Sequence, residues 1–241
     1  MPWALFCVAV GFFFLLGRRL GWSKEIIGTL ILVGGLGNTS IVGIPMLDAL
    51  YGHHAIPIAM IVDQAGSYLV MSTLGLFVAA YCGVGHTSWR TVAYRVVTYP
   101  PFIGMAVAFL LLPVDYPETV SVLFKRISDC LVPMALLSVG MQMSIKGVGG
   151  LRTKLLAGLG FKLVLCPALV MLAYLVTGTK MNFSDHVILV EAAMGPSIGA
   201  GIIASQHELN PHLVTLMISV GIPLSVISAP LINMLAISIG V

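Results

Sequence analysis

The stretch GNTSIVGIP, Gly37 to Pro45, lies inside an apolar run that is long enough to cross a membrane. It holds two glycines, a proline, an asparagine and two hydroxyl side chains. Such residues break a helix, and each backbone group left unpaired in lipid costs on the order of several kcal/mol. A break is tolerated only where it is buried in protein or lines a wet cavity. The stretch therefore predicts an interrupted membrane helix whose backbone serves a binding site.

A second apolar run carries the same kind of interruption. The run HVILVEAAMGPSIGAGIIASQ, His186 to Gln206, is broken in its middle by glycines, a proline and a serine. It comes five spans after the first interrupted run, so the two cross the membrane in opposite directions. This pattern is typical of inverted-repeat secondary transporters, whose binding site lies at the midplane where the breaks meet. There, half-helix N-termini offer positive charge to an anion, and unpaired carbonyls can bind a cation. The alternative is two simple kinks, each filled by a neighbouring helix.

Composition places the whole chain in a membrane. Of its 241 residues, 59% are hydrophobic and 9% are charged, with a mean hydropathy of +1.05, whereas soluble domains are about 25% charged. Apolar runs of about 20 residues match a hydrocarbon core about 30 Å thick. The net charge of +3 arises from short loops between these runs, which argues against nucleic-acid binding. We predict an all-α integral membrane protein with eight spans, 2–17, 26–51, 56–82, 94–113, 127–145, 155–177, 186–206 and 212–239.

The basic residues predict the orientation of these spans. When the loops are numbered from the first, the odd loops hold eight of the twelve Lys and Arg residues: Arg18, Arg19, Lys24, Arg90, Arg95, Lys146, Arg152 and Lys154. Cytoplasmic loops are enriched in Lys and Arg, so the odd loops are expected in the cytoplasm and both termini outside. The first run has its basic residues after it, whereas a secretory signal has them before, so 2–17 is expected to be a span. We expect a multi-pass protein of the cell (plasma or inner) membrane.

Five motifs in this chain are similar to those of one transporter family. They are GNTSIVGIPMLDALYG (37–52), LVPMALLSVGMQMS (131–144), KLVLCPALVML (162–172), AAMGPSIGAGIIA (192–204) and SVGIPLSVISAPLI (219–232). With them the chain resembles the auxin efflux carrier family of permeases, within the superfamily of the bile acid/sodium symporters. The resemblance covers essentially the whole chain, and the first motif is the most specific.

The resemblance implies two inverted repeats, each with two scaffold helices followed by three transport-domain helices. The fourth helix of each repeat is then a crossover helix broken at a proline, and Pro45 and Pro196 mark those breaks. Residues 1–82 would be the remainder of the first repeat, and 94–241 the second, with scaffold helices in 94–145 and transport-domain helices in 155–239. Family members usually have ten spans, so we expect a shortened relative or a fragment that lacks the first two. The residues expected to bind substrate flank the two breaks and are Asn38, Thr39, Ser40, Gly43, Pro45, Gly195, Pro196 and Ser197.

Ionisable residues inside the spans are expected to be functional, because a charge at mid-bilayer is costly. Asp63, followed by Gln64, lies well inside the third span and is expected to couple transport to a proton or cation. The alternative is a carboxylate capped by hydroxyls or by Lys162. Glu191, just before the second break, either titrates or contacts substrate, or it faces an outer aqueous vestibule. Lys162 either snorkels to the interface or supplies a counter-charge for an anionic substrate.

Other chemistries find little support in the sequence. The segment GPSIG (195–199) matches the G-x-S-x-G pattern of serine hydrolases. That pattern works at a strand-to-helix turn, and here it lies in an apolar helix, so we expect neither an enzyme nor a catalytic residue. His53 and His54 have no third ligand nearby, and we expect no metal site and no cofactor.

The sequence thus predicts a secondary active transporter of small organic anions such as carboxylates, working by alternating access and coupled to H⁺ or Na⁺. The anionic preference comes partly from the resemblance and partly from the half-helix dipoles. One alternative is a cation/proton antiporter or sodium symporter of related fold. Another is a non-transporting membrane sensor or partner subunit. The expected partners are the substrate, the coupling ion and the lipid bilayer, with a homodimer left open.

Overall fold

The computed structural model describes residues 1–83, 90, 94, 97–98, 100–142 and 148–239. These residues are nearly all helical, and their only extended pairing is one isolated antiparallel bridge. Four of the described helices are long and apolar enough to cross a membrane unaided: Pro2–Arg19, His53–Cys82, Gly149–Thr177 and Pro211–Ile239. The predicted all-α membrane fold is confirmed.

The first third of the chain forms three helical segments, and the middle one is broken. Helix α1 (Pro2–Arg19) is followed by α2 (Lys24–Thr29), which continues through a π-helical turn, η1 (Leu30–Gly34), and then unwinds. The helix resumes as the π-helical turn η2 (Thr39–Gly43) and α3 (Ile44–Tyr51). The third segment runs through η3 (His53–Ala55), α4 (Ile56–Ile61), η4 (Val62–Tyr68), η5 (Met71–Gly75) and α5 (Leu76–Cys82).

The rest of the chain repeats this arrangement after an inserted helical pair. The pair is α7 (Pro100–Leu111) and α8 (Glu118–Gln142). The next long helix runs through α9 (Val148–Gly160), η6 (Phe161–Leu165) and α10 (Cys166–Thr177). The second broken helix is α11 (Phe183–Ala192) followed by α12 (Ile198–Gln206), and α13 (Pro211–Ile239) completes the described chain.

The predicted spans correspond to these helices, with differences at their ends. Parts of 94–113 and 127–145 lie outside the described residues. Helix α8 begins at Glu118 rather than at 127, because the charged first part of this segment is helical although it is not apolar. Helix α11 begins at Phe183 rather than at 186. There Asn182 and Asp185 form a capping box, in which each side chain accepts a hydrogen bond from the other residue's backbone N–H.

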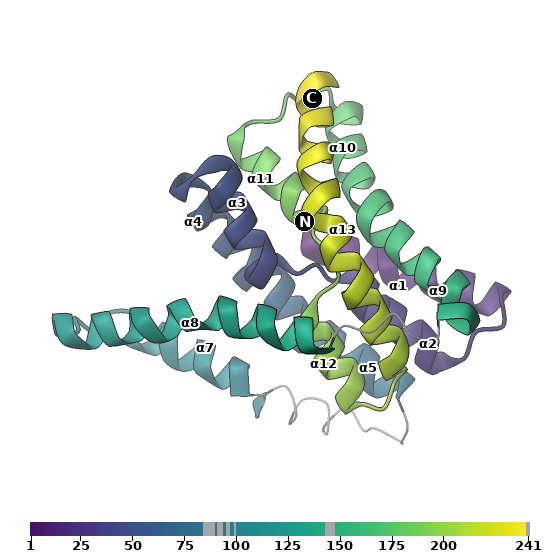
Figure 1. Ribbon diagram of the computed structural model, residues 1–241, viewed down its shortest axis with the longest axis horizontal. Helices are drawn as coiled ribbons and strands as arrows, with labels where there is room; N and C mark the ends of the chain where they lie inside the picture. The colour runs from purple at the N-terminus through teal and green to yellow at the C-terminus, as the bar shows by residue number, and fades with distance from the viewer. Residues whose placement is uncertain (84–89, 91–93, 95–96, 99, 143–147, 240–241) are drawn as a thin grey trace.

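The helices differ in how closely they pack (Figure 1). Helices α7 and α8 project away from the others, and the described side chains of α8 are exposed. Helix α8 meets the remaining helices through contacts with α13 and with η2 of the first broken helix. Helix α13 packs against α9 and α12 and also against η1 of the first broken helix, so the first and last parts of the chain contribute to one buried core.

An aromatic cluster in that core joins α1 to the long helix α9–α10. The ring of Phe161 lies 5.0 Å from Phe12 and 4.9 Å from Phe13, measured between ring centroids. Phe161 and Phe13 are each at most 2% exposed. The cluster holds η6 against α1, and the residue after Phe161 is therefore fixed at the depth of the helix breaks.

Candidate functional site

The two unwound segments lie against each other and exchange backbone hydrogen bonds. The segment between η1 and η2 pairs with the segment between α11 and α12 through an antiparallel bridge from Gly37 to Pro196. The N–H of Asn38 donates to the carbonyl of Gly195 at 2.8 Å, and the N–H of Ser197 donates to the carbonyl of Leu36 at 3.0 Å. The breaks predicted from the sequence therefore meet, and each supplies partners for the other's unpaired backbone groups.

The position predicted for the first break was wrong. The helix is already unwound at Gly37, where the bridge forms, and it resumes at Thr39. Pro45 lies in the first turn of α3, after the π-helical turn Thr39–Gly43. Proline is tolerated in a first helical turn because the N–H that it lacks would have little use there. Pro196, in contrast, forms part of the second break as predicted.

Equivalent side chains cap the two half-helices that leave the crossing. The Oδ1 of Asn38 accepts a hydrogen bond from the N–H of Ile41 at 3.2 Å. The Oγ of Ser197 accepts one from the N–H of Ala200 at 3.3 Å. Both caps span three residues, and both capping residues also donate their own N–H across the crossing. The two N-termini are therefore built alike, and each presents a partial positive charge at the crossing.

We expect Ser197→Ala to lower the free energy of unfolding by about 1 kcal/mol, the usual cost of losing an N-cap. The change leaves the backbone bond from position 197 to Leu36 in place. Thermal unfolding in detergent measures the effect. Ser205→Ala, on an exposed position of the same helix, is the matched control and should leave the unfolding temperature unchanged. Equal unfolding temperatures for the two variants would contradict the capping role.

The carboxylate of Asp63 lies at the start of the second half of the first broken helix. Its Oδ1 accepts hydrogen bonds from the hydroxyls of Thr39 at 2.5 Å and Ser40 at 2.6 Å. Its Oδ2 accepts one from the amide of Gln64 at 2.9 Å. Asp63 is only 3% exposed. The hydroxyls of Thr39 and Ser40 thus cap this carboxylate, as one of the predicted alternatives has it, and the ammonium of Lys162 bonds elsewhere.

A cavity of about 120 Å³ opens beside this carboxylate. Its lining comes from both broken helices and from the third segment, and consists of Gly37, Asn38, Thr39, Ser40, Ile41, Asp63, Ser67, Tyr68, Met71, Ser197 and Gly199. Asn38 is 4% exposed, and its Nδ2 is buried without a hydrogen-bond partner. Leaving a buried donor without a partner is costly, so this amide is available to donate a hydrogen bond to a ligand in the cavity.

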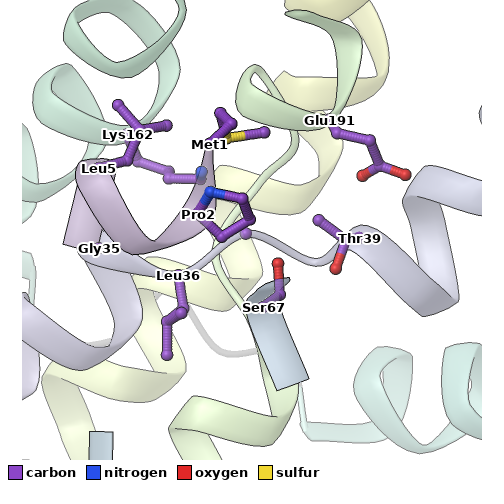
Figure 2. A pocket seen from close by; sticks show the side chains of 10 residues that line it. Met1, Pro2, Leu5, Gly35, Leu36, Thr39, Ser67, Lys162 and Glu191 are labelled. Atoms are coloured by element: carbon purple, nitrogen blue, oxygen red, sulfur yellow. The ribbon is translucent and has the colours of Figure 1, made fainter. Parts of the chain in front are cut away.

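A smaller cavity of about 10 Å³ adjoins the first, and Gly37, Thr39 and Ser67 line both (Figure 2). Lys162 and Glu191 both line it, and both are at most 2% exposed. The ammonium of Lys162 donates to the carbonyl of Ala192 at 3.2 Å, where α11 ends. Snorkelling to the interface was therefore the wrong interpretation of Lys162, because its charge is held at the crossing.

Glu191 has an unusual environment for a carboxylate. Neither of its side-chain oxygens has a hydrogen-bond partner, and the residue is 1% exposed. A Cβ placed on Gly43 would lie 2.6 Å from the Oε2 of Glu191, so only glycine leaves room for this carboxylate. In Figure 2 the carboxylate points away from the Lys162 side chain. The alternative of an outer aqueous vestibule was wrong for this arrangement, since the group is enclosed.

The family of the protein follows from comparison with known sequences. A family model described as "Membrane transport protein" matches residues 84–233, which is more than half of the chain. The chain belongs to this membrane transport protein family. The resemblance to the auxin efflux carrier family is thereby confirmed, and the protein is a multi-pass membrane transporter.

Two curated relatives of this transporter come from archaea. An uncharacterized transporter of Methanocaldococcus jannaschii is 26% identical over 218 residues, which cover 87% of this chain and 69% of the relative. An uncharacterized transporter of Methanothermobacter thermautotrophicus is 24% identical over 223 residues, covering 90% of this chain and 71% of the relative. Both names indicate transport and neither states a substrate.

Some residues of the transporter's cavity were not predicted. Ser67 and Met71 line it and lie four and eight residues after Asp63, on the same face of a helix. Helical periodicity from Asp63 would have identified both. Gly199 would have needed the structure, because its place in the cavity depends on where α12 begins. Among the described residues there is no cluster that could hold a metal ion.

Proposed function

We propose that this transporter is a secondary active carrier of small organic anions such as carboxylates. It would work by alternating access and be coupled to H⁺ or Na⁺. The single observation that carries the anionic preference is the unpaired Nδ2 of Asn38 in the cavity at the crossing. In the cell membrane, both termini would lie outside, as the distribution of basic residues predicts.

The charges around the cavity support this choice. The second half of the first broken helix begins at Thr39. The hydroxyls of Thr39 and Ser40 bond to Asp63, so a carboxylate already lies at this N-terminal end. Within the described part of the chain, no carboxylate bonds to the equivalent N-terminus of α12, at Ser197. An anion bound beside Ser197 would meet this positive helix end and the donor of Asn38 together. The substrate would thus take the place at α12 that Asp63 takes at the first broken helix.

The size and lining of the cavity favour a small acid. About 120 Å³ holds several waters or a compact carboxylate but not a large conjugated ligand. Met71 provides the cavity with an apolar, adaptable wall, while the hydroxyls and the amide lie at the crossing. A short carboxylic acid, with one charged end and a small apolar body, matches both parts.

The test uses purified protein in proteoliposomes with an imposed pH gradient, and uptake of radiolabelled mono- and dicarboxylates is recorded. The informative variant is Asn38→Asp. The aspartate keeps the oxygen that caps Ile41, but it replaces the unpaired donor with a negative charge. We expect the KM for the transported acid to rise at least about tenfold, since a lost hydrogen bond to a charged group is worth about 1.5–3 kcal/mol.

The matched control is Asn210→Asp. Asn210 caps α13 through the N–H of Leu213 at 2.9 Å and does not line the cavity, so its replacement should leave the KM unchanged. A lower KM in Asn38→Asp would indicate a cationic substrate and overturn the proposal. Absence of any gradient-dependent uptake, in proteoliposomes whose protein is folded, would favour a sensor or a partner subunit.

A further inference from the structure

Two buried carboxylates lie near the crossing, and their surroundings are opposite. Asp63 receives three hydrogen bonds from side chains. Glu191 is equally buried and receives none on either oxygen. Burying an ionised carboxylate without partners is far more costly than burying the neutral acid. Glu191 is therefore the carboxylate whose surroundings suit a bound proton.

The other charged groups that face Glu191 are few. Lys162, on η6, lines the same small cavity as Glu191, and Asp63, on η4, lines the larger cavity. Lys162 stays outside ion-pair distance, more than 4.0 Å from the carboxylate, and its ammonium bonds to Ala192 instead. The hydroxyl of Tyr174, on α10, donates a hydrogen bond to the carboxylate of Asp185, on α11. His186 contacts Asn233, and Cys166, on α10, lies near Lys162.

A path for the proton leads from Glu191 to the substrate cavity. The cavity of about 10 Å³ beside Glu191 has room for one water. Three residues, Gly37, Thr39 and Ser67, line both this cavity and the larger one. The hydroxyl of Thr39, one of the shared lining residues, also bonds to Asp63. The two cavities are therefore neighbours, and a proton on Glu191 lies close to the space in which the substrate would bind.

The position of Lys162 favours H⁺ over Na⁺ as the coupling ion. A sodium ion at the crossing would need carbonyl oxygens at the end of a half-helix, and the carbonyl of Ala192 is such a group. The Lys162 ammonium already occupies it, and a Cβ placed on Gly37 would lie only 3.0 Å from the ammonium nitrogen. A second cation there would be repelled at close range in a poorly screened site.

We propose that Glu191 carries the coupling proton, so that H⁺ and not Na⁺ drives the transporter. Glu191 takes a proton from water on one side of the membrane, becomes a neutral acid, and returns the proton to water on the other side. The Lys162 ammonium at the crossing takes the place that a metal cation would otherwise fill. This inference rests on the proposed function for its transport readout, and a second readout keeps it independent of the substrate.

The transport experiment compares wild type with Glu191→Gln in sodium-free proteoliposomes. With one proton per anion, a gradient of one pH unit supports accumulation up to about tenfold. We expect the wild type to accumulate substrate and Glu191→Gln to show no accumulation while it still exchanges labelled for unlabelled substrate at a measurable rate. Glu118→Gln, at an exposed position of α8, is the matched control and should accumulate substrate as the wild type does. Accumulation that persists in Glu191→Gln, or that needs Na⁺ in the wild type, would overturn the inference.

The second readout is infrared spectroscopy of the reconstituted protein at neutral pH, without substrate. A buried protonated carboxylic acid gives a C=O stretching band apart from those of carboxylates and amides. We expect this band in the wild type and in Asp63→Asn, and its loss in Glu191→Gln. A band lost in Asp63→Asn but kept in Glu191→Gln would assign the proton to Asp63. If no carboxylate is transported, the proposed function fails while this band still decides the assignment to Glu191.

Discussion

Gly195→Ala is expected to reduce transport at least about a hundredfold and to lower the free energy of unfolding by about 1–3 kcal/mol, the usual range for overpacking. A Cβ at this position would lie 2.8 Å from the Oγ of Ser225, 2.9 Å from the carbonyl oxygen of Gly221 and 3.0 Å from the Cα of Ile222. Two of these atoms are backbone of α13, which cannot turn aside as a side chain can. The second break must therefore move away from α13.

That displacement acts directly on the crossing, because the carbonyl of Gly195 accepts the N–H of Asn38. The measurements are gradient-driven uptake in proteoliposomes and thermal unfolding in detergent. Gly160→Ala is the matched control, since a Cβ at Gly160 meets nothing within 4 Å. It should keep or slightly raise stability, because alanine is the better helix former. Wild-type transport by Gly195→Ala would mean that the crossing tolerates separation from α13.

Lys162→Met is expected to abolish transport, with a loss of at least about a hundredfold, while the protein remains folded. Methionine has a similar length and packs well in an apolar core, so the steric change is small. The charge is lost, however, and the carbonyl of Ala192 loses its buried hydrogen-bond donor. The small cavity that Glu191 lines also loses its positive charge.

Lys154→Met provides an unusually close control for this variant. The ammonium of Lys154 also donates to a backbone carbonyl, that of Gly150, at the same distance of 3.2 Å. Lys154 belongs to the same long helix but its bond is exposed, where a single charged hydrogen bond contributes little. We expect uptake by Lys154→Met to equal that of the wild type. Equal losses in both variants would show that the effect of Lys162 is general to lysine and not specific to the crossing.

The sequence was sufficient to predict the spans, both interruptions and the meeting of the two breaks. These follow from local signals: apolar runs of membrane length, and glycine, proline and hydroxyl residues inside them. Asp63 could also be identified as a carboxylate inside a span, with hydroxyls or Lys162 as possible partners, but only the structure shows that Thr39 and Ser40 supply the hydroxyls.

The failures concern contacts between segments that are distant in sequence. Pro45 was expected at the first break because the resemblance implies a crossover helix broken at a proline, but the chain is already unwound at Gly37, which pairs with Pro196. Snorkelling is the usual behaviour of a membrane lysine, and only the aromatic packing of Phe161 against α1 shows that Lys162 is held inside. The sequence likewise does not show that the carboxylate of Glu191 lacks hydrogen-bond partners, because this depends on how distant segments pack around it.

The reciprocal backbone bonds at the crossing also constrain how the protein is made. Asn38 and its partner Gly195 are 157 residues apart, the difference between their positions in the chain. At about 5–20 residues per second, a ribosome needs roughly 10–30 s to synthesise the chain between them. During that time the first broken helix is in the membrane without the partner that satisfies its backbone. Its unpaired groups must be held by water, by the insertion machinery or by a temporary helical conformation until the second broken helix arrives.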